Sequence, residues 1–150
     1  MISGTSRDGV DAALVDFPDG PPRVVEAICA PYPPALAESL ERLVRTGQRP
    51  AEAELAAMDI PICAHFSQTV GVLLEKASVS PAQVAATGSH GQTVWHDPGG
   101  PRPESIQLGD PVRIARQTGI VTVGDFRRSD IEAGGQGAPL APLLHQALFG

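Results

Sequence analysis

The chain has 150 residues and a mass of 15.6 kDa, which is enough for one domain with a buried core. Hydrophobic residues make up 42% and charged residues 19%, which excludes collagen, a coiled coil and intrinsic disorder, while 16 Gly and 15 Pro predict many turns. The formal net charge is −6, and no basic cluster is larger than the pair Arg127 and Arg128, so a surface that binds nucleic acid is not expected.

The sequence also argues against a membrane protein. No apolar run approaches the roughly 18 residues that a membrane span needs, and the start of the chain lacks the basic-then-apolar pattern of a signal peptide. We therefore expect a cytoplasmic protein with no membrane partner. Cys29 and Cys63 lie in apolar surroundings without the spacing of a metal site, so we expect reduced core thiols rather than a disulfide.

Both ends of the chain favour a fragment of a longer protein. Met1 to Ser3 leave almost no room for a strand before the turn at Gly4. The apolar stretch from Ala138 to Phe149 predicts a helix that stops at Gly150 without a polar tail.

The first half of the chain predicts strands and then helices. Val10 to Phe17 and Arg23 to Ala30 flank a dense turn signal and predict a β-hairpin. With the shortened strand before Gly4, the opening becomes three successive antiparallel strands. A helix is expected from Pro34, with apolar residues at spacings of three and four until Gly47. A second helix follows Pro50, and we expect Pro61 to kink it rather than end it.

The second half predicts alternating strands and helices. We expect a strand from Val84 to Ser89, a loop from Asp97 to Pro101, a helix capped by Asp110 that ends at Gly119, and a buried strand from Ile120 to Val123. A β-meander followed by right-handed αβ units predicts an α/β protein, a mixed sheet with helices on both faces. This order matches the ribonuclease-H-like fold, which is the half-unit of actin-like ATPases and sugar kinases.

The first segment whose residue types suggest a binding site lies between the first two expected strands. Glycines let backbone N–H groups approach a phosphate, hydroxyls donate to its oxygens, and a carboxylate can hold Mg²⁺ directly or through water. A plain hairpin turn is the alternative, because Gly, Ser and Asp are common in turns. The segment is Gly4, Thr5, Ser6, Arg7, Asp8, Gly9, Val10 and Asp11.

A second polar segment, from Gly88 to His96, begins at the end of the strand expected from Val84 to Ser89 and continues past it. Ligands bind beyond the carboxyl ends of strands in open α/β sheets, so this position suits a site. Its polar side chains could read sugar hydroxyls, and Trp95 could stack on a ring. His90 and His96 lack a third ligand at a convincing spacing, so histidines satisfied within a loop are favoured over a metal site.

A third segment runs from Asp125 to Ile131, after the last expected strand, and we expect it to be extended. An arginine fork recognises carboxylates and phosphates with two parallel hydrogen bonds, so the pair Arg127 and Arg128 favours an anionic substrate. The alternative is a surface ion pair with Asp125 or Asp130.

These motifs together resemble one family, anhydro-N-acetylmuramic acid kinase. The resemblance extends over essentially the whole chain, with four motifs in the expected order. They are Ile2-Ser3-Gly4-Thr5-Ser6 through Asp11, Gly88-Ser89-His90-Gly91-Gln92-Thr93-Val94, Gln107-Leu108-Gly109-Asp110-Pro111, and Asp125-Phe126-Arg127-Arg128 through Gly134-Gly135-Gln136-Gly137-Ala138-Pro139-Leu140. Arg7 stands where the family usually has leucine. We expect this additional positive charge beside the phosphate turn to alter the affinity of the protein for nucleotide.

The resemblance implies a bacterial kinase of cell-wall recycling with the two-lobe fold of actin and hexokinase. Such an enzyme uses ATP, with Mg²⁺, to phosphorylate O6 of 1,6-anhydro-N-acetylmuramic acid while water opens the anhydro ring. Residues 1–150 would form the N-terminal lobe, truncated at both ends and without the second lobe. A small anhydro-amino-sugar would be the partner, and a homodimer is compatible with this reading.

On matching positions, the resemblance implies that Gly4 to Asp11 bind ATP and that Thr93 and Arg128 contact the anhydro-sugar. The family's catalytic aspartate belongs to an Asp-x-Gly-Pro-Gly-Asn segment that these residues do not contain, so we assign no catalytic residue and no metal ligand. Two alternatives are a ribonuclease-H-like nuclease that uses Asp8, Asp11 and a third carboxylate for two metals, and a binding module without catalysis.

Overall fold

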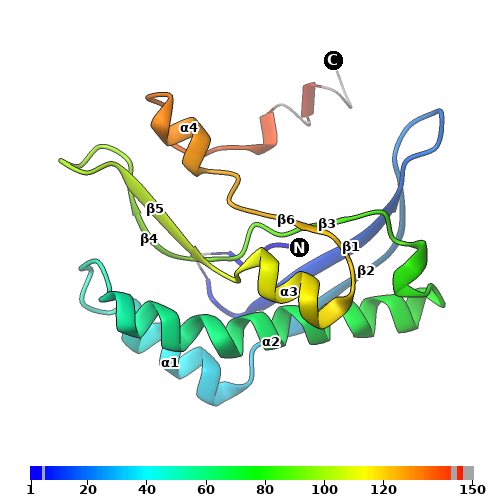
Figure 1. Cartoon of the computed structure of the whole chain (residues 1–150), viewed down its shortest axis with the longest axis horizontal. Helices are drawn as coiled ribbons and strands as arrows, with labels where there is room; N and C mark the ends of the chain where they lie inside the picture. The colour runs from blue at the N-terminus through cyan, green and yellow to red at the C-terminus, as the bar shows by residue number, and fades with distance from the viewer. Residues whose placement is uncertain (5, 143–144, 147–150) are drawn as a thin grey trace.

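The computed structural model describes residues 1–4, 6–142 and 145–146. Strands and helices both contribute, so the expected mixed α/β class is confirmed. The elements are, in chain order, β1 (Gly9–Asp16), β2 (Arg23–Pro31), α1 (Pro34–Val44), α2 (Glu52–Ala77), the 3₁₀ helix η1 (Pro81–Gln83), β3 (Thr87–Gly88), β4 (Gln92–Asp97), β5 (Glu104–Leu108), α3 (Pro111–Thr118), β6 (Thr122–Val123) and α4 (Arg128–Glu132). Figure 1 labels the strands and the α-helices.

The opening hairpin is present, and the short first segment joins it to the rest of the fold. β1 and β2 pair antiparallel, as predicted. The strand expected before Gly4 is reduced to single bridges: Ile2 bridges Asp11 antiparallel, with N–O distances of 3.0 and 2.9 Å, and Ser3 bridges Gln92 in parallel. Residues 1–3 therefore lie between β1 and β4.

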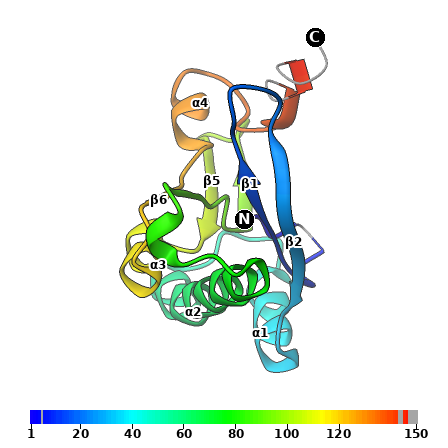
Figure 2. The same cartoon turned by 90° about the vertical axis from the view of Figure 1, so that its right-hand side faces the viewer.

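α2 supplies the centre of the core. Ile62, Cys63 and Phe66 on this helix are fully buried, and they pack with Val10 of β1 and Leu40 of α1. The helix continues through residue 61, as its apolar period predicts. In Figures 1 and 2, α1, α2 and α3 gather on one side of the β1–β2 hairpin, and exposed residues of both strands form its opposite face.

By length and composition alone, α2 could also cross a membrane. The core helix of a soluble protein passes the same criterion, and Phe66 and Leu73 of α2 are buried inside the molecule.

Both cysteines are free thiols, as predicted, but the expectation that both lie in the core is wrong for Cys29. Cys29 is exposed on β2, and Cys63 is buried on α2. Burial, together with the carboxylate of Asp59, raises the pKa of the Cys63 thiol to about 12. At neutral pH this thiol is therefore protonated and unreactive.

The strand expected from Val84 to Ser89 is shorter than predicted. Only Thr87 and Gly88 pair with β6, in parallel. Val84 N instead donates to Pro81 O at 3.1 Å, so this amide closes the 3₁₀ turn and does not extend the ladder.

A second antiparallel hairpin, β4 with β5, occupies the region where the sequence predicted a polar segment and a loop. The polar residue Gln92 is completely buried at the start of β4, so side-chain polarity there does not mark exposure. The expected loop from Asp97 to Pro101 is the connection of this hairpin.

The structure corrects one expectation at the end of the chain and leaves another open. Arg128 to Glu132 form the short helix α4, so the expectation of an extended segment from Asp125 to Ile131 is wrong. The helix expected from Ala138 to Phe149 lies partly outside the described residues, and 141–142 and 145–146 are helical.

Candidate functional site

Ser3 and Gln92 hold the glycine-rich turn from inside the molecule. Both side chains are buried, and Gln92 Oε1 lies 2.7 Å from Ser3 Oγ. The amide nitrogen of Gln92 donates to Gly4 O at 3.0 Å. Because a buried amide with partners on both ends has little freedom, the start of the turn is fixed to β4.

The described residues of the turn, Gly4 and residues 6–8, extend from this anchor toward solvent. Arg7 N donates to Gly4 O at 3.2 Å, and Ser6 Oγ donates to Asp8 Oδ1 at 2.8 Å. Gly4, Ser6 and Asp8 are exposed, and Thr5 lies outside the described residues. The turn thus presents a hydroxyl, a carboxylate and an uncovered glycine backbone to solvent.

The remaining residues of the expected ATP segment belong to β1. Gly9 is packed against β2, where an added Cβ would overlap Ala30 O, and the side chain of Val10 lies in the core. Asp11 is exposed next to Cys29, its partner in the ladder.

A cleft of about 770 Å³ opens between α2, β5, α3 and α4, and we call it the central cleft. It lies beyond β3 and β6, where their parallel strands end, which is the position that the sequence favoured for a site. Its polar lining includes Asp59, Ser89, His90, Gln107, Asp125 and Arg128.

Arg128 reaches the central cleft from the first residue of α4. Its Nε lies 2.7 Å from Asp125 Oδ2, and its side chain is 71% exposed, so the ion pair is open to solvent. The expected surface ion pair with Asp125 is therefore present, and it lies in a cleft where an anion could exchange for the carboxylate. Asp125 has a φ of +59°, which bends the chain sharply before α4.

Thr93 connects the turn with the central cleft. It follows Gln92 in β4, and its Oγ1 lies 3.4 Å from Nε2 of Gln107, which lines the cleft. The side chain of Thr93 is not itself part of the cleft lining. The structure therefore brings Thr93 near the cleft wall, while Arg128 lies in it.

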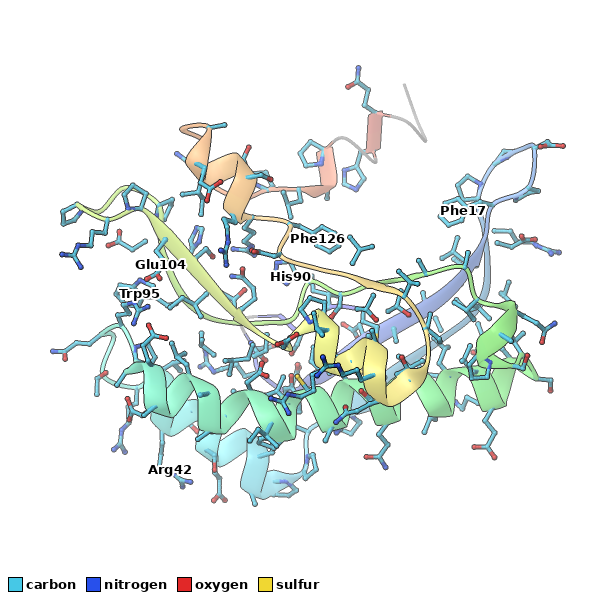
Figure 3. The ribbon with its side chains drawn as sticks, viewed as in Figure 1. Phe17, Arg42, His90, Trp95, Glu104 and Phe126 are labelled. Carbon is cyan, nitrogen blue, oxygen red and sulfur yellow. The ribbon has the colours of Figure 1, made fainter. Side chains whose placement is uncertain are left out.

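His90 and His96 face Arg127. Arg127 Nε donates to His90 Nε2 at 2.9 Å, and its NH1 nitrogen lies 3.5 Å from His96 Nδ1. Burial lowers the pKa of both imidazoles, and the positive charge of Arg127 lowers it further. In Figure 3, His90 lies beneath the segment that leads through Phe126 to α4.

Two buried hydroxyl groups have no partner among the described residues, Tyr32 Oη and Ser89 Oγ. Burial raises the pKa of Tyr32 to about 12, so it remains a neutral phenol. Ser89 lines the central cleft, where an unsatisfied hydroxyl is available to a bound ligand.

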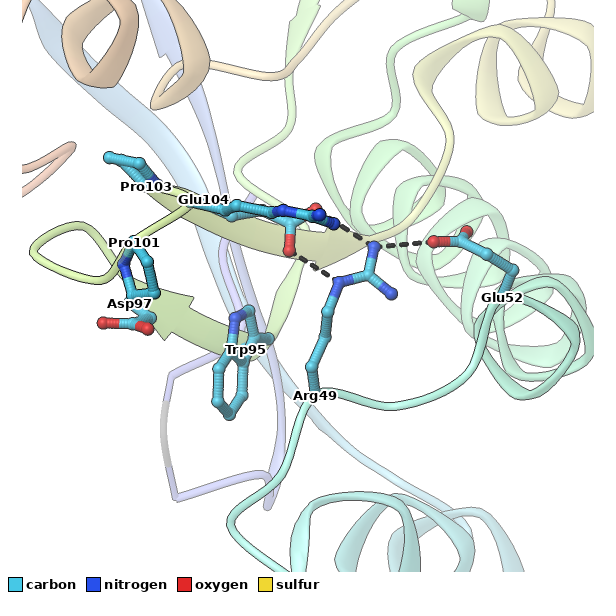
Figure 4. A pocket seen from close by; sticks show the side chains of 8 residues that line it. Arg49, Glu52, Trp95, Asp97, Pro101, Pro103 and Glu104 are labelled. Atoms are coloured by element: carbon cyan, nitrogen blue, oxygen red, sulfur yellow. Dashed lines mark hydrogen bonds and ion pairs between the residues drawn. The ribbon is translucent and has the colours of Figure 1, made fainter.

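A second cavity of about 620 Å³ is lined by Trp95 and Arg49 (Figure 4). Arg49 donates to both oxygens of Glu104 at 2.7 and 3.0 Å, and to Glu52 at 2.6 Å. This guanidinium lowers the pKa of Glu104 and ties β5 to the start of α2. Because both carboxylates are already bound by Arg49, the residues that could contact a ring here are Trp95 and its neighbours.

The donor set fits a nucleotide-bound Mg²⁺ better than a metal held by protein alone. The described part of the chain contains no group of three His, Cys, Asp or Glu side chains that could hold a metal ion. A two-metal nuclease site from Asp8, Asp11 and a third carboxylate therefore has no support there. Mg²⁺ needs only one or two carboxylates when phosphates supply the other ligands, and the exposed Asp8 meets that need.

Sequence reasoning proposed the turn, Thr93 and Arg128 as site residues, but it did not predict which residues hold the turn and Thr93 in place. Gln92, which holds the turn, is a polar residue in a core position, and Gln107, which contacts Thr93, lies on the other strand of the β4–β5 hairpin. The alternation from Ser105 to Leu108 on the far side of a Gly-Pro loop is the signal that could have revealed the β4–β5 hairpin.

Comparison with known proteins gives one consistent result. The sequence model of the family described as "Anhydro-N-acetylmuramic acid kinase" matches residues 1–150. Proteins of that name from Pasteurella multocida and Mannheimia succiniciproducens are 45% and 42% identical to the chain over 149 residues, which is 99% of its length. The protein of that name from Shewanella pealeana is 45% identical over 150 residues. The chain spans 39% to 40% of the length of these relatives.

Proposed function

Because the chain belongs to the anhydro-N-acetylmuramic acid kinase family, we propose that it forms the N-terminal lobe of a kinase for a 1,6-anhydro-amino-sugar. The full-length enzyme transfers the γ-phosphoryl group of ATP to O6 of 1,6-anhydro-N-acetylmuramic acid, while water opens the anhydro ring. The product is N-acetylmuramic acid 6-phosphate, and the enzyme acts in cytoplasmic recycling of the cell wall.

The observation that carries this proposal is the connection between the glycine-rich turn and the central cleft. Gln92 holds the turn by its hydrogen bond to Gly4, and the next residue, Thr93, contacts Gln107 at the cleft wall. A phosphate donor at the turn and a sugar at the cleft would therefore be positioned by adjacent residues of one strand. Such a shared support suits a transfer reaction, which requires two substrates in fixed relative orientation.

Each element of the site has a part in the proposed reaction. The backbone of Gly4 and the hydroxyl of Ser6 bind phosphate oxygens, and Asp8 holds Mg²⁺ through water, which neutralises charge on the phosphates. Arg128 exchanges its contact with Asp125 for the lactyl carboxylate of the sugar. Thr93 and Ser89 hydrogen-bond sugar hydroxyls.

The proposed architecture is a ribonuclease-H-like lobe of a two-lobe enzyme. The order β2, β1, residues 1–3 and then the β3–β4 segment, with β6 parallel to β3, supports a single mixed sheet interrupted into short ladders. The relatives are much longer than the chain, which supports a second lobe that supplies the catalytic base and further nucleotide contacts. A homodimer of the full-length enzyme is compatible with these features.

The test is an assay of ADP release by the full-length kinase with ATP, Mg²⁺ and 1,6-anhydro-N-acetylmuramic acid. We expect release that requires the anhydro-sugar and is not supported by N-acetylmuramic acid, which has no anhydro ring to open. ADP release that is independent of the anhydro-sugar would contradict the proposal. Cleavage of nucleic acid with Mn²⁺ or Mg²⁺ would favour the nuclease alternative.

A further inference from the structure

Arg127 and Arg128 are neighbours in sequence but have different surroundings. Arg128 pairs with Asp125 in the central cleft. Arg127 makes none of the ion pairs found among the described residues, and its guanidinium faces His90 and His96. A guanidinium has only donors, so each imidazole must present a nitrogen without a proton.

The contacts of His90 determine which of its nitrogens carries the proton. Its Nδ1 lies 3.2 Å from the carbonyl oxygen of Gly91, which can only accept, so the proton is on Nδ1. Its Nε2 is then free to accept from Arg127 Nε at 2.9 Å. His90 is therefore a neutral imidazole in one tautomer. Protonation of its Nε2 would place two hydrogen-bond donors, His90 Nε2–H and Arg127 Nε–H, opposite each other.

His96 connects Arg127 to the β4–β5 hairpin through further polar contacts. Its Nδ1 lies 3.0 Å from Ser105 Oγ, and Ser105 Oγ accepts from Gln107 Nε2 at 2.7 Å. Since Gln107 lines the central cleft and contacts Thr93, the side chain of Arg127 is linked to the cleft wall.

The Cβ of Arg127 is also packed closely, in addition to the hydrogen bonds of its guanidinium. A Cβ added at Gly137 would lie 3.1 Å from Arg127 Cβ, so the glycine turn packs closely against this residue. Gly137 N also donates to Asp130 Oδ2 at 2.6 Å, which holds the turn on α4. The half-buried Arg127 thus lies between the turn and His90, directly before the first residue of α4.

We propose that Arg127 is a positioning residue: by binding the Nδ1–H tautomer of His90, it fixes the start of α4 and so orients Arg128 and Asp125 toward the anhydro-sugar. The sugar contact rests on the proposed function, whereas the tautomer and the orientation of Arg128 do not. Arg127 itself does not touch the substrate.

The kinetic test uses the full-length kinase and the variants Arg127→Leu, His90→Leu and His90→Gln. We expect Arg127→Leu and His90→Leu each to lower kcat/KM for the anhydro-sugar by about 10-fold or more, with KM for ATP changed by less than about twofold. The double variant should lose no more than either single variant, because both remove the same contact. His90→Gln should retain most activity, since Gln Oε1 can accept from Arg127.

The control is Arg116→Leu, which removes an exposed arginine of α3 and should leave both parameters unchanged. A role limited to stability would raise KM for ATP and for the sugar together, and it would make His90→Gln as damaging as His90→Leu. Either result would overturn the proposal, as would losses that add in the double variant.

A spectroscopic measurement separates this proposal from the proposed function. In long-range ¹H–¹⁵N spectra of the full-length protein, His90 should show a protonated Nδ1 and a bare Nε2. Arg127→Leu should abolish that single tautomer and shift the Nε–H signal of Arg128, whereas Arg116→Leu should do neither. If the parent protein has no kinase activity, the proposed function fails, but these spectra still test the role of Arg127. An unprotonated Nδ1 of His90 in the parent protein, or an Arg128 signal that does not shift in Arg127→Leu, would refute that role.

Discussion

Gly4 and Gly9 stand at the two ends of the same turn but face different constraints. A Cβ at Gly4 would meet only Ser6, at 3.6 Å from its Oγ, so a side chain fits there without disturbing the fold. A Cβ at Gly9 would overlap the backbone of Ala30 and Pro31. Substitution at Gly4 therefore reports on ligand approach, whereas substitution at Gly9 reports on the hairpin.

We predict that Gly4→Val in the full-length kinase weakens nucleotide binding far more than sugar binding, because the branched side chain blocks approach of phosphate to the backbone. Loss of one charge-assisted hydrogen bond corresponds to about 10-fold to 150-fold in affinity. Calorimetry with each ligand measures both effects. Equal losses for nucleotide and sugar would mean that the turn is structural.

Gly9→Ala serves as the contrasting variant. Its Cβ overlaps β2, so we expect a lower melting temperature and weaker binding of both ligands. A Gly9→Ala protein of parental stability would show that the hairpin can move apart and would remove the distinction between the two glycines.

Arg128→Lys keeps the charge in the central cleft but removes the planar fork, so a bidentate contact with the sugar carboxylate is lost. The expected decrease in kcat/KM for the anhydro-sugar is about 10-fold to 150-fold. Steady-state kinetics at varied sugar concentration measures it. Parental kinetics would leave Arg128 as an exposed partner of Asp125 with no role in binding.

At the scale of elements, the sequence predicts a helix correctly where the periodicity of its apolar residues agrees with the residues that begin or end it. The start of α1 at Pro34, the continuation of α2 through Pro61 and the cap of α3 by Asp110 follow from these local signals. Asp110 Oδ1 accepts from Val112 N at 2.7 Å and from Arg113 N at 3.2 Å, as a cap requires.

The elements that local signals miss depend on distant contacts. β4 begins at Gln92, whose burial is explained only by its bonds to Ser3 and Gly4, nearly ninety positions earlier in the chain. α4 has no apolar period, and the contacts of Arg127 and Asp130 outside the helix hold it in place. For the same reason the sequence proposed Arg128 as a site residue but could not distinguish its surroundings from those of Arg127.

Asp59 joins α2 to the loop before α3. Its Oδ1 accepts from Gly109 N at 2.8 Å and from Asp110 N at 3.1 Å, and its side chain is only 18% exposed. We predict that Asp59→Ala lowers the free energy of unfolding by about 1.5 to 3 kcal/mol, because both amides lose a charged acceptor.

Asp59→Asn retains an acceptor oxygen and should lose less, while Asp19→Ala in the exposed β1–β2 turn should have almost no effect. Urea unfolding of the full-length protein compares the three variants. An Asp59→Ala protein as stable as Asp19→Ala would show that water replaces the carboxylate at no cost.

The pKa of His90 is lowered from its ordinary value of 6.5 first by burial and then by the charges of Arg127 and the chain's amino group, against the opposing effect of the Gly91 carbonyl. The pKa of His96 is lowered by burial and by Arg127, although Asp97 opposes this. In both cases the unfolded chain binds protons more readily than the folded one.

Stability should therefore fall as the pH drops below about 6.5 and be fully present above it. Melting temperatures of the full-length protein between about pH 8 and pH 5.5 measure this dependence. The slope of melting temperature against pH should be smaller for His90→Gln, because this variant has no imidazole to protonate at position 90. An unchanged slope in that variant would mean that the acid sensitivity comes from other groups.

At the scale of the whole molecule, the described residues form an exposed turn and a central cleft, which we propose bind the phosphates and the sugar, and none of them is assigned as a catalytic base. The chain spans 39% to 40% of the length of its relatives, and its residues contain no Asp-x-Gly-Pro-Gly-Asn segment. We therefore predict that residues 1–150 produced alone release no ADP in the presence of the anhydro-sugar. Turnover similar to that of the full-length kinase would show that the second lobe is dispensable.

The most direct test of the central claim is identification of the product made by the full-length kinase from ATP and 1,6-anhydro-N-acetylmuramic acid. ³¹P–¹H correlated NMR should show phosphate on O6 of a ring-opened N-acetylmuramic acid, formed in a one-to-one ratio with ADP. Phosphate at another position, an intact anhydro ring in the product, or ring opening without consumption of ATP would contradict the assignment of this chain to a lobe that binds both substrates.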